Sequence, residues 1–331
     1  MRYFLRRFGF LVLTLWAAIT LNFFIPRMMP GDPAQAMLAK FAAQGTLDPH
    51  LLDAVKAMLG LPTEPLWQQY IQYLGNVVTG NFGVSYSFFP YSVMSIIAQA
   101  LPWTLVLVGL LTVISFVLGT LFGTIAAWRR GGWFDAVAPV VGTFTSAMPY
   151  FWVAMALLYF LGFVFHWFPI GGGYSGRIAP QLSWAFIGDA ALHSVLPALT
   201  LLITGVGGWL MGMRNNMINT LGEDFVLLAQ AKGLRSMTIA MRYAARNAIL
   251  PNVTGFAMSL GMVVGGSLLM ESVFNYPGMG NLMAIAVGSQ DYPLLQTLLL
   301  FVTTAVVLAN FLADVIYGVL DPRVRREGGV S

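Results

Sequence analysis

The sequence has 331 residues, of which 58% are hydrophobic and only 9% are charged, and its mean hydropathy is +0.75. So few charged side chains cannot cover a water-soluble surface, so the composition excludes a soluble protein and predicts an integral membrane protein. The chain has no cysteine, which excludes disulfides and thiolate metal sites, and its three scattered histidines do not predict a metal cluster.

Six apolar runs are long enough to cross about 30 Å of hydrocarbon, which takes roughly 20 helical residues. The first run follows MRYFLRR, but it is too long for a signal peptide and no small-x-small cleavage site closes it, so we expect a retained helix. The sequence therefore predicts an all-α integral membrane protein with six transmembrane helices. The six runs lie near residues 8–28, 102–128, 136–165, 191–213, 250–272 and 294–320.

The distribution of lysine and arginine predicts the orientation in the membrane. Thirteen of the seventeen basic residues fall at the two termini, after the second run, and between the fourth and fifth runs. Only Arg27, Lys40, Lys56 and Arg177 fall in the alternate loops. The positive-inside rule therefore places both termini in the cytoplasm. The net charge of +4 reflects this topology, and we do not expect nucleic acid to be a partner.

The chain divides into three parts: an N-terminal segment with the first transmembrane helix (1–28), an external loop (29–98), and a transmembrane core (99–331) that includes a cytoplasmic loop at 214–249. The large external loop follows the first helix. The cytoplasmic loop joins the fourth and fifth helices.

Two short helices are predicted in the external loop, at 48–60 and 65–83. The second is amphipathic and carries a belt of aromatic residues, which suits either the outer membrane interface or packing on neighbouring protein. A further external loop at 166–189 is rich in glycine, proline and aromatic residues, so we expect it to be irregular.

Close helix packing is predicted by glycines spaced four residues apart, and Pro149 predicts a kink in the third run. Asp314 is the one carboxylate well inside a run. A lone acid near a helix end more often caps or pins a neighbouring helix than carries protons, which disfavours proton-driven transport. The glycine pairs are Gly119/Gly123, Gly208/Gly212 and Gly261/Gly265.

Several motifs of enzyme active sites are absent from the sequence. It contains no phosphate-binding loop, no HExxH, no GxSxG, and no pair of acids on one intramembrane face. We therefore expect a non-catalytic chain with no catalytic residue, no cofactor and no metal of its own.

The cytoplasmic stretch 223–251, EDFVLLAQAKGLRSMTIAMRYAARNAILP, predicts a helix, a glycine turn and a second helix. Glu223 and Asp224 suit the start of a helix and Gly233 suits its end. A second helix can start at Ser236. A segment this small fits the groove of a cytoplasmic partner, or else lies flat on anionic lipid.

This stretch resembles the cytoplasmic signature loop of binding-protein-dependent ABC importer permeases, in the long-spaced form of the dipeptide/oligopeptide permease family. The resemblance rests on Ala229-x-x-x-Gly233 and on the run from Arg246 to Pro251. The general signature begins Glu-Ala-Ala, whereas Leu227 and Leu228 hold the first two positions here, and the proline lies further from the glycine. Both departures fit the peptide-type subfamily.

Other stretches resemble landmarks of the same family in the same order. The six runs, the MRYFLRR start and the large first external loop also match the first of the two permease subunits in such systems. The landmarks are Pro30-Gly31-Asp32-Pro33, the segment from Glu271 to Gly280, Gln290-Asp291-Tyr292-Pro293 and Asp321-Pro322-Arg323.

The resemblance implies a heterodimeric channel in the cytoplasmic (inner) membrane of a bacterium or archaeon. This chain would pair with a homologous second permease subunit within the lipid. Two ABC ATPase subunits would bind ATP and Mg beneath the pair, and an extracytoplasmic solute-binding protein would deliver the ligand. Residues 223–233 would form the coupling helix that transmits the motion of the ATPases to an outer gate.

The residues implied for ATPase coupling are Glu223, Asp224, Phe225, Leu228, Ala229, Lys232 and Gly233. Those implied for the external gate are Glu271, Tyr276, Pro277 and Gly278. Those expected to line the translocation path are Thr143, Thr145, Ser146, Asn252, Thr254 and Ser259.

The cargo is the least constrained part of this interpretation. Similar family members carry dipeptides, oligopeptides, nickel chelates or β-linked oligosaccharides, and peptides are the main reading. The aromatic loop from Phe165 to Tyr174 could stack on sugar rings, so cello- or β-gluco-oligosaccharides are the alternative. An ATP-independent secondary transporter is a remote alternative, in which deletion of 223–233 would leave transport intact.

Overall fold

The computed structural model describes residues 2–29 and 64–320, and within these it describes the side chains of 8–29 and 64–313. The predicted helix at 48–60, the Pro30–Pro33 and Asp321–Arg323 landmarks, and the Asp314 side chain lie outside this description.

The described part of the chain is helical, and its one bridge between extended residues joins Val84 and Ser92. Several helices contain wider π-helical turns, labelled η. In chain order the helices are α1 (Arg2–Met28), α4 (Leu66–Thr79), α5 (Val93–Thr104), η1 (Leu105–Gly109), α6 (Leu110–Trp128), α7 (Trp133–Ala147), α8 (Tyr150–Leu157), η2 (Leu158–Val164), α9 (Trp184–Leu221), α10 (Asp224–Ala231), α11 (Ser236–Thr238), η3 (Ile239–Ala245), α12 (Arg246–Ala248), α13 (Leu250–Val263), α14 (Leu268–Val273), α15 (Met279–Gly288) and α16 (Tyr292–Leu320).

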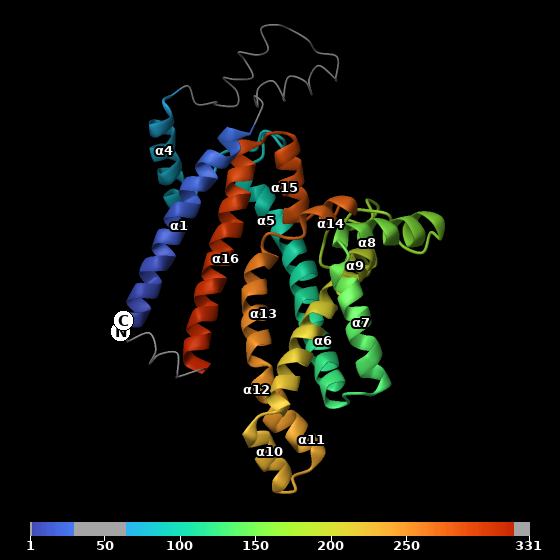
Figure 1. Ribbon diagram of the computed structural model, residues 1–331. Helices are drawn as coiled ribbons and strands as arrows, with labels where there is room; N and C mark the ends of the chain where they lie inside the picture. Colours follow the sequence, from blue (N-terminus) through green and yellow to red (C-terminus); the bar gives the residue numbers. More distant parts are fainter. Residues whose placement is uncertain (1, 30–63, 321–331) are drawn as a thin grey trace.

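The centre of the fold is the pair α6 and α9, which share the most extensive helix contact. Helix α7 packs on α9 on one side of this pair, whereas α13 and α16 lie on the other side (Figure 1). Helix α1 packs on α16 at the edge, with α4 alongside it. Helices α10 to α12 form a small module at one end of the bundle, opposite α4 and α15.

Four helical segments are long and apolar enough to cross a membrane, and they correspond to the first, second, fourth and sixth predicted runs: Phe8–Met28, Val93–Trp128, Trp184–Leu221 and Tyr292–Ala313. The fourth run was expected to end at 213, but α9 continues to Leu221. Its 38 residues extend about 57 Å at 1.5 Å per residue, so its end projects well beyond the hydrocarbon thickness. The stretch from Arg214 to Leu221 contains no glycine or proline, so the helix continues as far as Gly222.

The third predicted run, 136–165, is not one straight helix. It breaks into α7 and the α8–η2 segment, which meet at an angle of 92°. The reason is local: Met148 is extended (ψ 131°) before Pro149, as the residue preceding a proline prefers, and the chain restarts as a helix after Pro149. The proline expected to kink this helix therefore divides it.

The fifth predicted run, 250–272, is also wrong in its extent. Helix α13 has 14 residues, about 21 Å, which is too short to cross. The helix ends at Val263, where Gly266 adopts a left-handed φ of +68° that favours glycine. Helix α14 then runs sideways, and α15 continues the rise toward the start of α16 (Figure 1).

Glycines let the central helices approach at backbone distance, as the sequence predicted for Gly119 and Gly123 on α6. A Cβ on Gly119 would lie 2.5 Å from Cβ of Trp209, and one on Gly123 would lie 2.8 Å from Cβ of Met213. A Cβ on Gly261 would likewise lie 3.1 Å from the Ala305 carbonyl oxygen on α16. These close contacts confirm that small residues set the helix spacing.

The Gly208/Gly212 pair behaves differently, because a Cβ on Gly208 would meet nothing within 4 Å. The close contact lies one residue earlier. A Cβ on Gly207 would lie 2.7 Å from the carbonyl carbon of Gly142 on α7. Since Gly142 and Gly207 lie on different helices, no spacing within one run could predict this contact.

We expect Gly207→Ala to lower the free energy of unfolding by about 1–3 kcal/mol, because the added methyl group forces α7 away from α9. The matched control is Gly208→Ala on the next residue, where the methyl group has space and the helix gains up to about 1 kcal/mol in propensity. Thermal unfolding of the purified protein in detergent measures both. Equal melting temperatures for the two variants would contradict the assigned contact.

Candidate functional site

Helix α10 is closed by a glycine turn, as predicted. Gly233 has a φ of +70°, and its N–H donates to the Gln230 carbonyl at 2.9 Å. The Leu234 N–H donates to the Ala229 carbonyl at 3.4 Å. These two bonds form a Schellman cap, which satisfies carbonyls at the helix end and reverses the chain toward α11.

The inner face of α10 packs on the second helix of the module. Val226, Ala229 and Ile239 are at most 3% exposed and form one cluster, against which Trp128 and Leu221 pack. A neighbouring cluster joins Met213 and Met217 of α9 to alanines of η3 and α12. The module is therefore fixed to the neighbouring ends of α6 and α9.

The outer face of α10 is apolar and open. Phe225 is 39% exposed, Leu227 52% and Leu228 57%, and the polar residues Glu223, Asp224 and Lys232 around them are also exposed. An apolar patch with a charged rim is typical of a surface that docks a partner.

Two residues change their place relative to the sequence prediction. Ala229 was grouped with Phe225 and Leu228, but it is 2% exposed and faces the inside of the module. Leu227 was not selected, yet it belongs to the exposed face. The buried residues are Val226 and Ala229, three apart on the helix, and this period could have separated the two faces.

The four predicted gate residues lie together in a closed cluster at the other end of the bundle. Glu271 is fully buried. Its carboxylate accepts hydrogen bonds from the N–H groups of Ser267 (3.1 Å), Gly280 (2.8 Å) and Asn281 (3.3 Å), and from the Thr104 hydroxyl (3.2 Å). Thr104 in turn accepts from the Met279 N–H at 2.7 Å. The carboxylate thus holds the start of α15 against α5, where the helix dipole also favours negative charge.

The other gate residues seal this cluster. Tyr276 is 2% exposed and meets the Trp103 ring edge to face, with ring centroids 5.7 Å apart. A Cβ on Gly278 would lie 2.5 Å from the Thr104 hydroxyl oxygen. A Cβ on Gly173 would lie 2.6 Å from the Pro277 ring, so the glycine-rich loop that precedes α9 packs directly on this segment. Glu271 and Tyr276 are therefore enclosed by these contacts.

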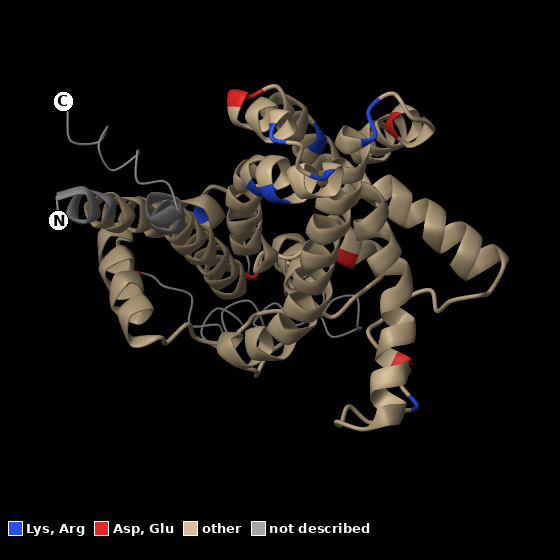
Figure 2. Ribbon diagram, turned by 90° about the horizontal axis from the view of Figure 1, so that it is seen from below, with Lys and Arg blue, Asp and Glu red and all other residues tan. Residues whose placement is uncertain are grey.

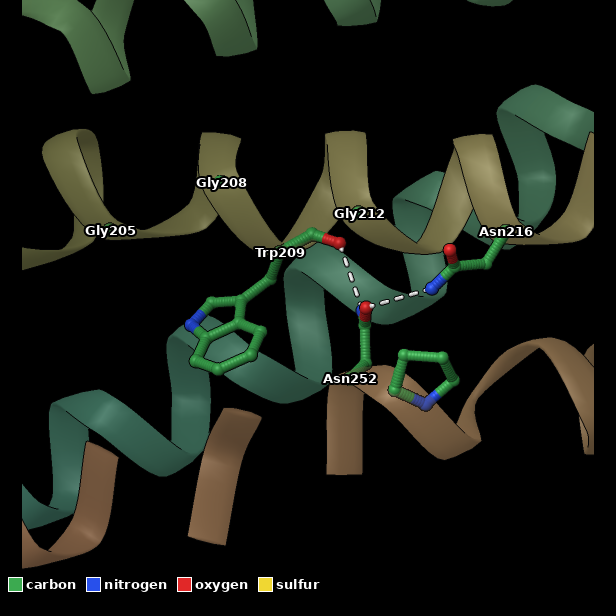
Figure 3. Close-up of a pocket in the computed structure, with 7 residues that line it drawn as sticks. Gly205, Gly208, Trp209, Gly212, Asn216 and Asn252 are labelled. Atoms are coloured by element: carbon green, nitrogen blue, oxygen red, sulfur yellow. Dashed lines mark hydrogen bonds between the residues drawn. The ribbon is translucent and has the colours of Figure 1, made fainter. Parts of the chain in front are cut away.

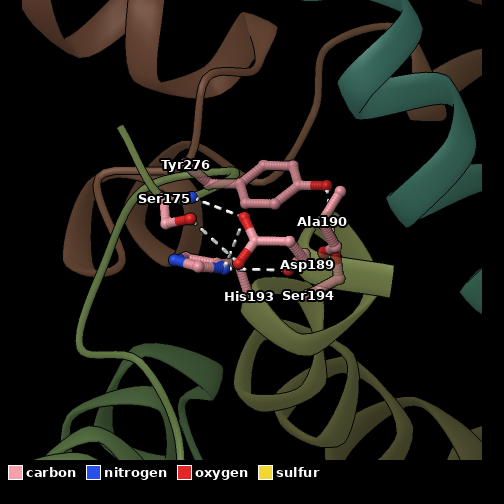
Figure 4. Close-up of polar contacts among 6 residues, drawn as sticks. All are labelled: Ser175, Asp189, Ala190, His193, Ser194 and Tyr276. Atoms are coloured by element: carbon pink, nitrogen blue, oxygen red, sulfur yellow. Dashed lines mark hydrogen bonds and ion pairs between the residues drawn. The ribbon is translucent and has the colours of Figure 1, made fainter. Parts of the chain in front are cut away.

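The start of α9 joins the same cluster through polar contacts (Figure 4). The Asp189 carboxylate accepts from the Ser175 N–H at 2.6 Å and from its hydroxyl at 3.1 Å. The hydroxyls of Ser194 and Tyr276 lie 3.1 Å apart. Since α9 also reaches α10 at its other end, one helix connects the Glu271 cluster with the exposed face of α10.

The Gln290–Pro293 landmark also has a structural role. Asp291 is fully buried at the start of α16, where its carboxylate accepts from the Ser85 hydroxyl and from the N–H groups of Ser87 (2.8 Å) and Leu294 (3.2 Å). The segment that precedes α5 is thereby tied to the start of α16.

The six residues expected to line a path are not brought together in this chain. Three lie on α7 and three on α13, and α6 and α9 stand between these helices (Figure 1). Four of their hydroxyls donate back to carbonyls of their own helix, and Asn252 is 5% exposed and donates to the Trp209 carbonyl at 3.1 Å. The residues on α7 are Thr143, Thr145 and Ser146, and those on α13 are Asn252, Thr254 and Ser259.

An open recess of about 480 Å³ lies between α9 and α13 (Figure 3). Of the predicted path residues only Asn252 lines it, so sequence reasoning missed most of its wall. The signal that could have found it is the single helical face formed by three glycines and an asparagine of α9. The lining residues are Gly205, Gly208, Trp209, Gly212, Asn216, Pro251 and Asn252.

Comparison with known proteins identifies the family. Residues 119–326 match the family described as binding-protein-dependent transport system inner membrane component, and residues 1–115 match the N-terminal region of such components. The chain belongs to this family. It is an integral inner-membrane component of a binding-protein-dependent transport system.

Relatives of this transport component match over almost their whole length. The di/tripeptide transport system permease protein of Pseudomonas aeruginosa is 32% identical over 97% of this chain and 98% of its own. The dipeptide transport system permease proteins of Escherichia coli K12 (32%, 99% of both chains) and Lactococcus lactis (31%, 98% of this chain and 99% of its own) are similar to it as well.

Charged groups of the transport component gather at the module end. Figure 2 views the molecule from that side and shows lysine and arginine around α10 to α12 and the turn between α6 and α7. Helix α1 starts, and α16 ends, toward the same side of the bundle.

We expect Thr104→Val to loosen the cluster around Glu271 in this transport component, because the Met279 N–H loses its acceptor and Glu271 loses one donor. Losing a hydrogen bond worth about 1–1.5 kcal/mol speeds local exchange about tenfold. Hydrogen exchange measured by mass spectrometry over residues 278–281 tests this. Thr104→Ser keeps the hydroxyl and serves as the control; faster exchange in both variants would refute the role of the hydroxyl.

Proposed function

We propose that the chain is one permease subunit of an ATP-driven importer and forms half of a translocation path for dipeptides and oligopeptides. The names of the relatives, which match over nearly the whole chain, support this cargo. The chain itself is proposed to be non-catalytic.

The observation that carries the proposal is the exposed apolar face of α10 on a module held rigidly to α9. We propose that this face binds one of two ABC ATPase subunits, which hold ATP and Mg. Phe225, Leu227 and Leu228 would enter a groove of the ATPase, while Ala229 and Gly233 keep the helix pair packed and turned. Closure of the ATPase pair on ATP would then move the module.

The proposed orientation has both termini and α10 in the cytoplasm, with the Glu271 cluster outside. The chain would cross the membrane six times, the third crossing being the bent α7 and α8 and the fifth being α13 together with α15. The Glu271 cluster would form the closed external gate, onto which an extracytoplasmic solute-binding protein delivers peptide.

A homologous second permease subunit would complete the path. The recess beside Gly208 and Asn252 is open in the single chain, and α7 and α13 lie on different sides of the α6–α9 pair. We propose that the second subunit covers one of these surfaces. A path lined by amides, hydroxyls and glycines would bind a peptide weakly, which leaves selection to the binding protein.

The oligosaccharide alternative gains no support from the aromatic loop. Tyr174 stacks on Trp103 with ring centroids 6.0 Å apart, and Phe165 stacks on Trp167 at 5.2 Å. Each ring thus packs on a neighbour through one face, while Phe165 and Trp167 stay 51% and 66% exposed, which gives the loop no feature that favours a sugar over a peptide. Nickel chelates and an ATP-independent mechanism are likewise less favoured than a peptide importer.

We expect Leu228→Arg to weaken ATPase binding at least tenfold, because a charge replaces an apolar anchor at the centre of the exposed face. Co-purification of the ATPase subunits with the tagged permease measures it. Val78→Arg is the control, since Val78 is 86% exposed on α4 at the other end. Undiminished co-purification with L228R would refute the docking face.

We expect peptides to stimulate ATP hydrolysis by the reconstituted importer with its binding protein, and a cello-oligosaccharide pool to have no effect. A di- and oligopeptide pool and the sugar pool are compared at equal concentration in proteoliposomes. Stimulation by the sugar pool alone would refute the peptide cargo and assign oligosaccharides in its place. Uptake without ATP, retained after deletion of 223–233, would refute the ATP-driven mechanism.

A further inference from the structure

Asp135 and Arg214 form an ion pair between the start of α7 and the lower part of α9. The Arg214 Nε lies 2.6 Å from the Asp135 Oδ1, and their side chains are 20% and 8% exposed. The other carboxylate oxygen of Asp135 accepts from the Gly131 N–H at 3.0 Å. One carboxylate therefore joins α7, the α6–α7 turn and α9.

Arg214 lies in the part of α9 that is packed on the coupling module. Its neighbour Met213 is 1% exposed and Met217 is fully buried, and both pack on Ala240, Ala244 and Ala248. Helix α9 ends at Leu221, two turns beyond Arg214, and α10 begins at Asp224. A displacement of α10 to α12 therefore acts on α9 at the level of Arg214.

Helix α7 leads from this pair to the outer cluster by its own route. It turns by 92° into α8, whose Ala154 is fully buried in a cluster with Met270 of α14 and with Tyr276. Met270 precedes Glu271, the residue that holds the start of α15. Two helices therefore connect to the outer cluster, which is the cluster around Glu271 and Tyr276. Helix α9 contacts it directly through Ser194 and Tyr276, and α7 contacts it through α8.

We propose that the Asp135–Arg214 pair is the positioning tie that makes α7 follow α9 when the coupling module moves. This inference rests on the proposed function. With the ion pair intact, α7 and α9 move together, and their joint displacement opens the outer cluster. Without the tie, α9 moves alone, so ATP hydrolysis continues while the cluster stays closed. The tie acts through the helices and has no contact with nucleotide or cargo.

The test uses the assembled importer in proteoliposomes and measures peptide uptake per ATP hydrolysed. In Asp135→Ala and Arg214→Ala we expect ATPase activity to persist while uptake per ATP falls about tenfold, within the range of typical coupling energies. The double variant should be no worse than either single variant, because both remove one interaction. Arg129→Gln is the matched control, since it removes an exposed charge from the same turn.

A reversible replacement of the tie sharpens the test, because the chain has no cysteine of its own. In Asp135→Cys/Arg214→Cys we expect uptake per ATP to be low, to recover when a short reducible bis-thiosulfonate links the two thiols, and to fall again on reduction. The wild-type importer receives the same treatment as a control.

Three results would overturn the proposal. The first is unchanged uptake per ATP in the single variants. The second is a parallel fall of ATPase activity, uptake and assembled complex, which assigns the pair a structural role only. The third is failure of the cross-link to restore uptake. If instead the wild-type complex shows no ATP-driven uptake, the proposed function fails and this inference fails with it.

Discussion

The backbone contacts of α9 are the constraint on which the rest of the fold depends. In lipid, hydrophobic burial does not drive helices together, so their association relies on close packing and a few polar contacts. Gly119 and Gly123 bring α6 against α9, and Gly142 and Gly207 do the same for α7. Because α9 is held on both sides, its position fixes the α10–α12 module at one end and the Tyr276 cluster at the other.

Carboxylates supply the polar contacts of this fold, and they do so by a common device. Glu271 receives N–H groups at the start of α15, Asp291 does so at the start of α16, and Asp135 receives the N–H of Gly131. Each acid thus satisfies donors that a helix start or a turn would otherwise leave unpaired. In a chain with so few charges, these acids join segments to one another by accepting hydrogen bonds. This structural role does not involve proton transfer.

The sequence predicted those features that arise from neighbouring residues. The apolar runs, the turn at Gly233, the interruption at Pro149 and the contacts of Gly119, Gly123 and Gly261 each follow from composition or spacing within one segment. The comparisons also confirm the family that the signature loop and its landmarks resembled. The length of α9 and the division of the third and fifth runs were not predicted, because hydropathy records where apolar residues lie and does not record the direction of the helix.

Contacts between distant segments could not be predicted from one sequence. The Gly142–Gly207 approach, the Asp135–Arg214 pair and the recess between α9 and α13 each join residues of different helices. Ala229 illustrates the same limit, since only the position of Ile239 shows which face of α10 is covered. Asn252 both lines the recess and donates to the Trp209 carbonyl, and this second contact likewise depends on the packing of α13 against α9.

The turn at Gly266 gives the segment from α13 to α15 a mechanical property that α9 does not have. A continuous helix resists both compression and torsion along its length. Two half-helices joined by a turn resist compression where they abut but let one half rotate without twisting the other. The orientations of α13 and α15 are therefore set separately, that of α13 by its close contact with α16 at Gly261 and that of α15 by the hydrogen bonds of Glu271.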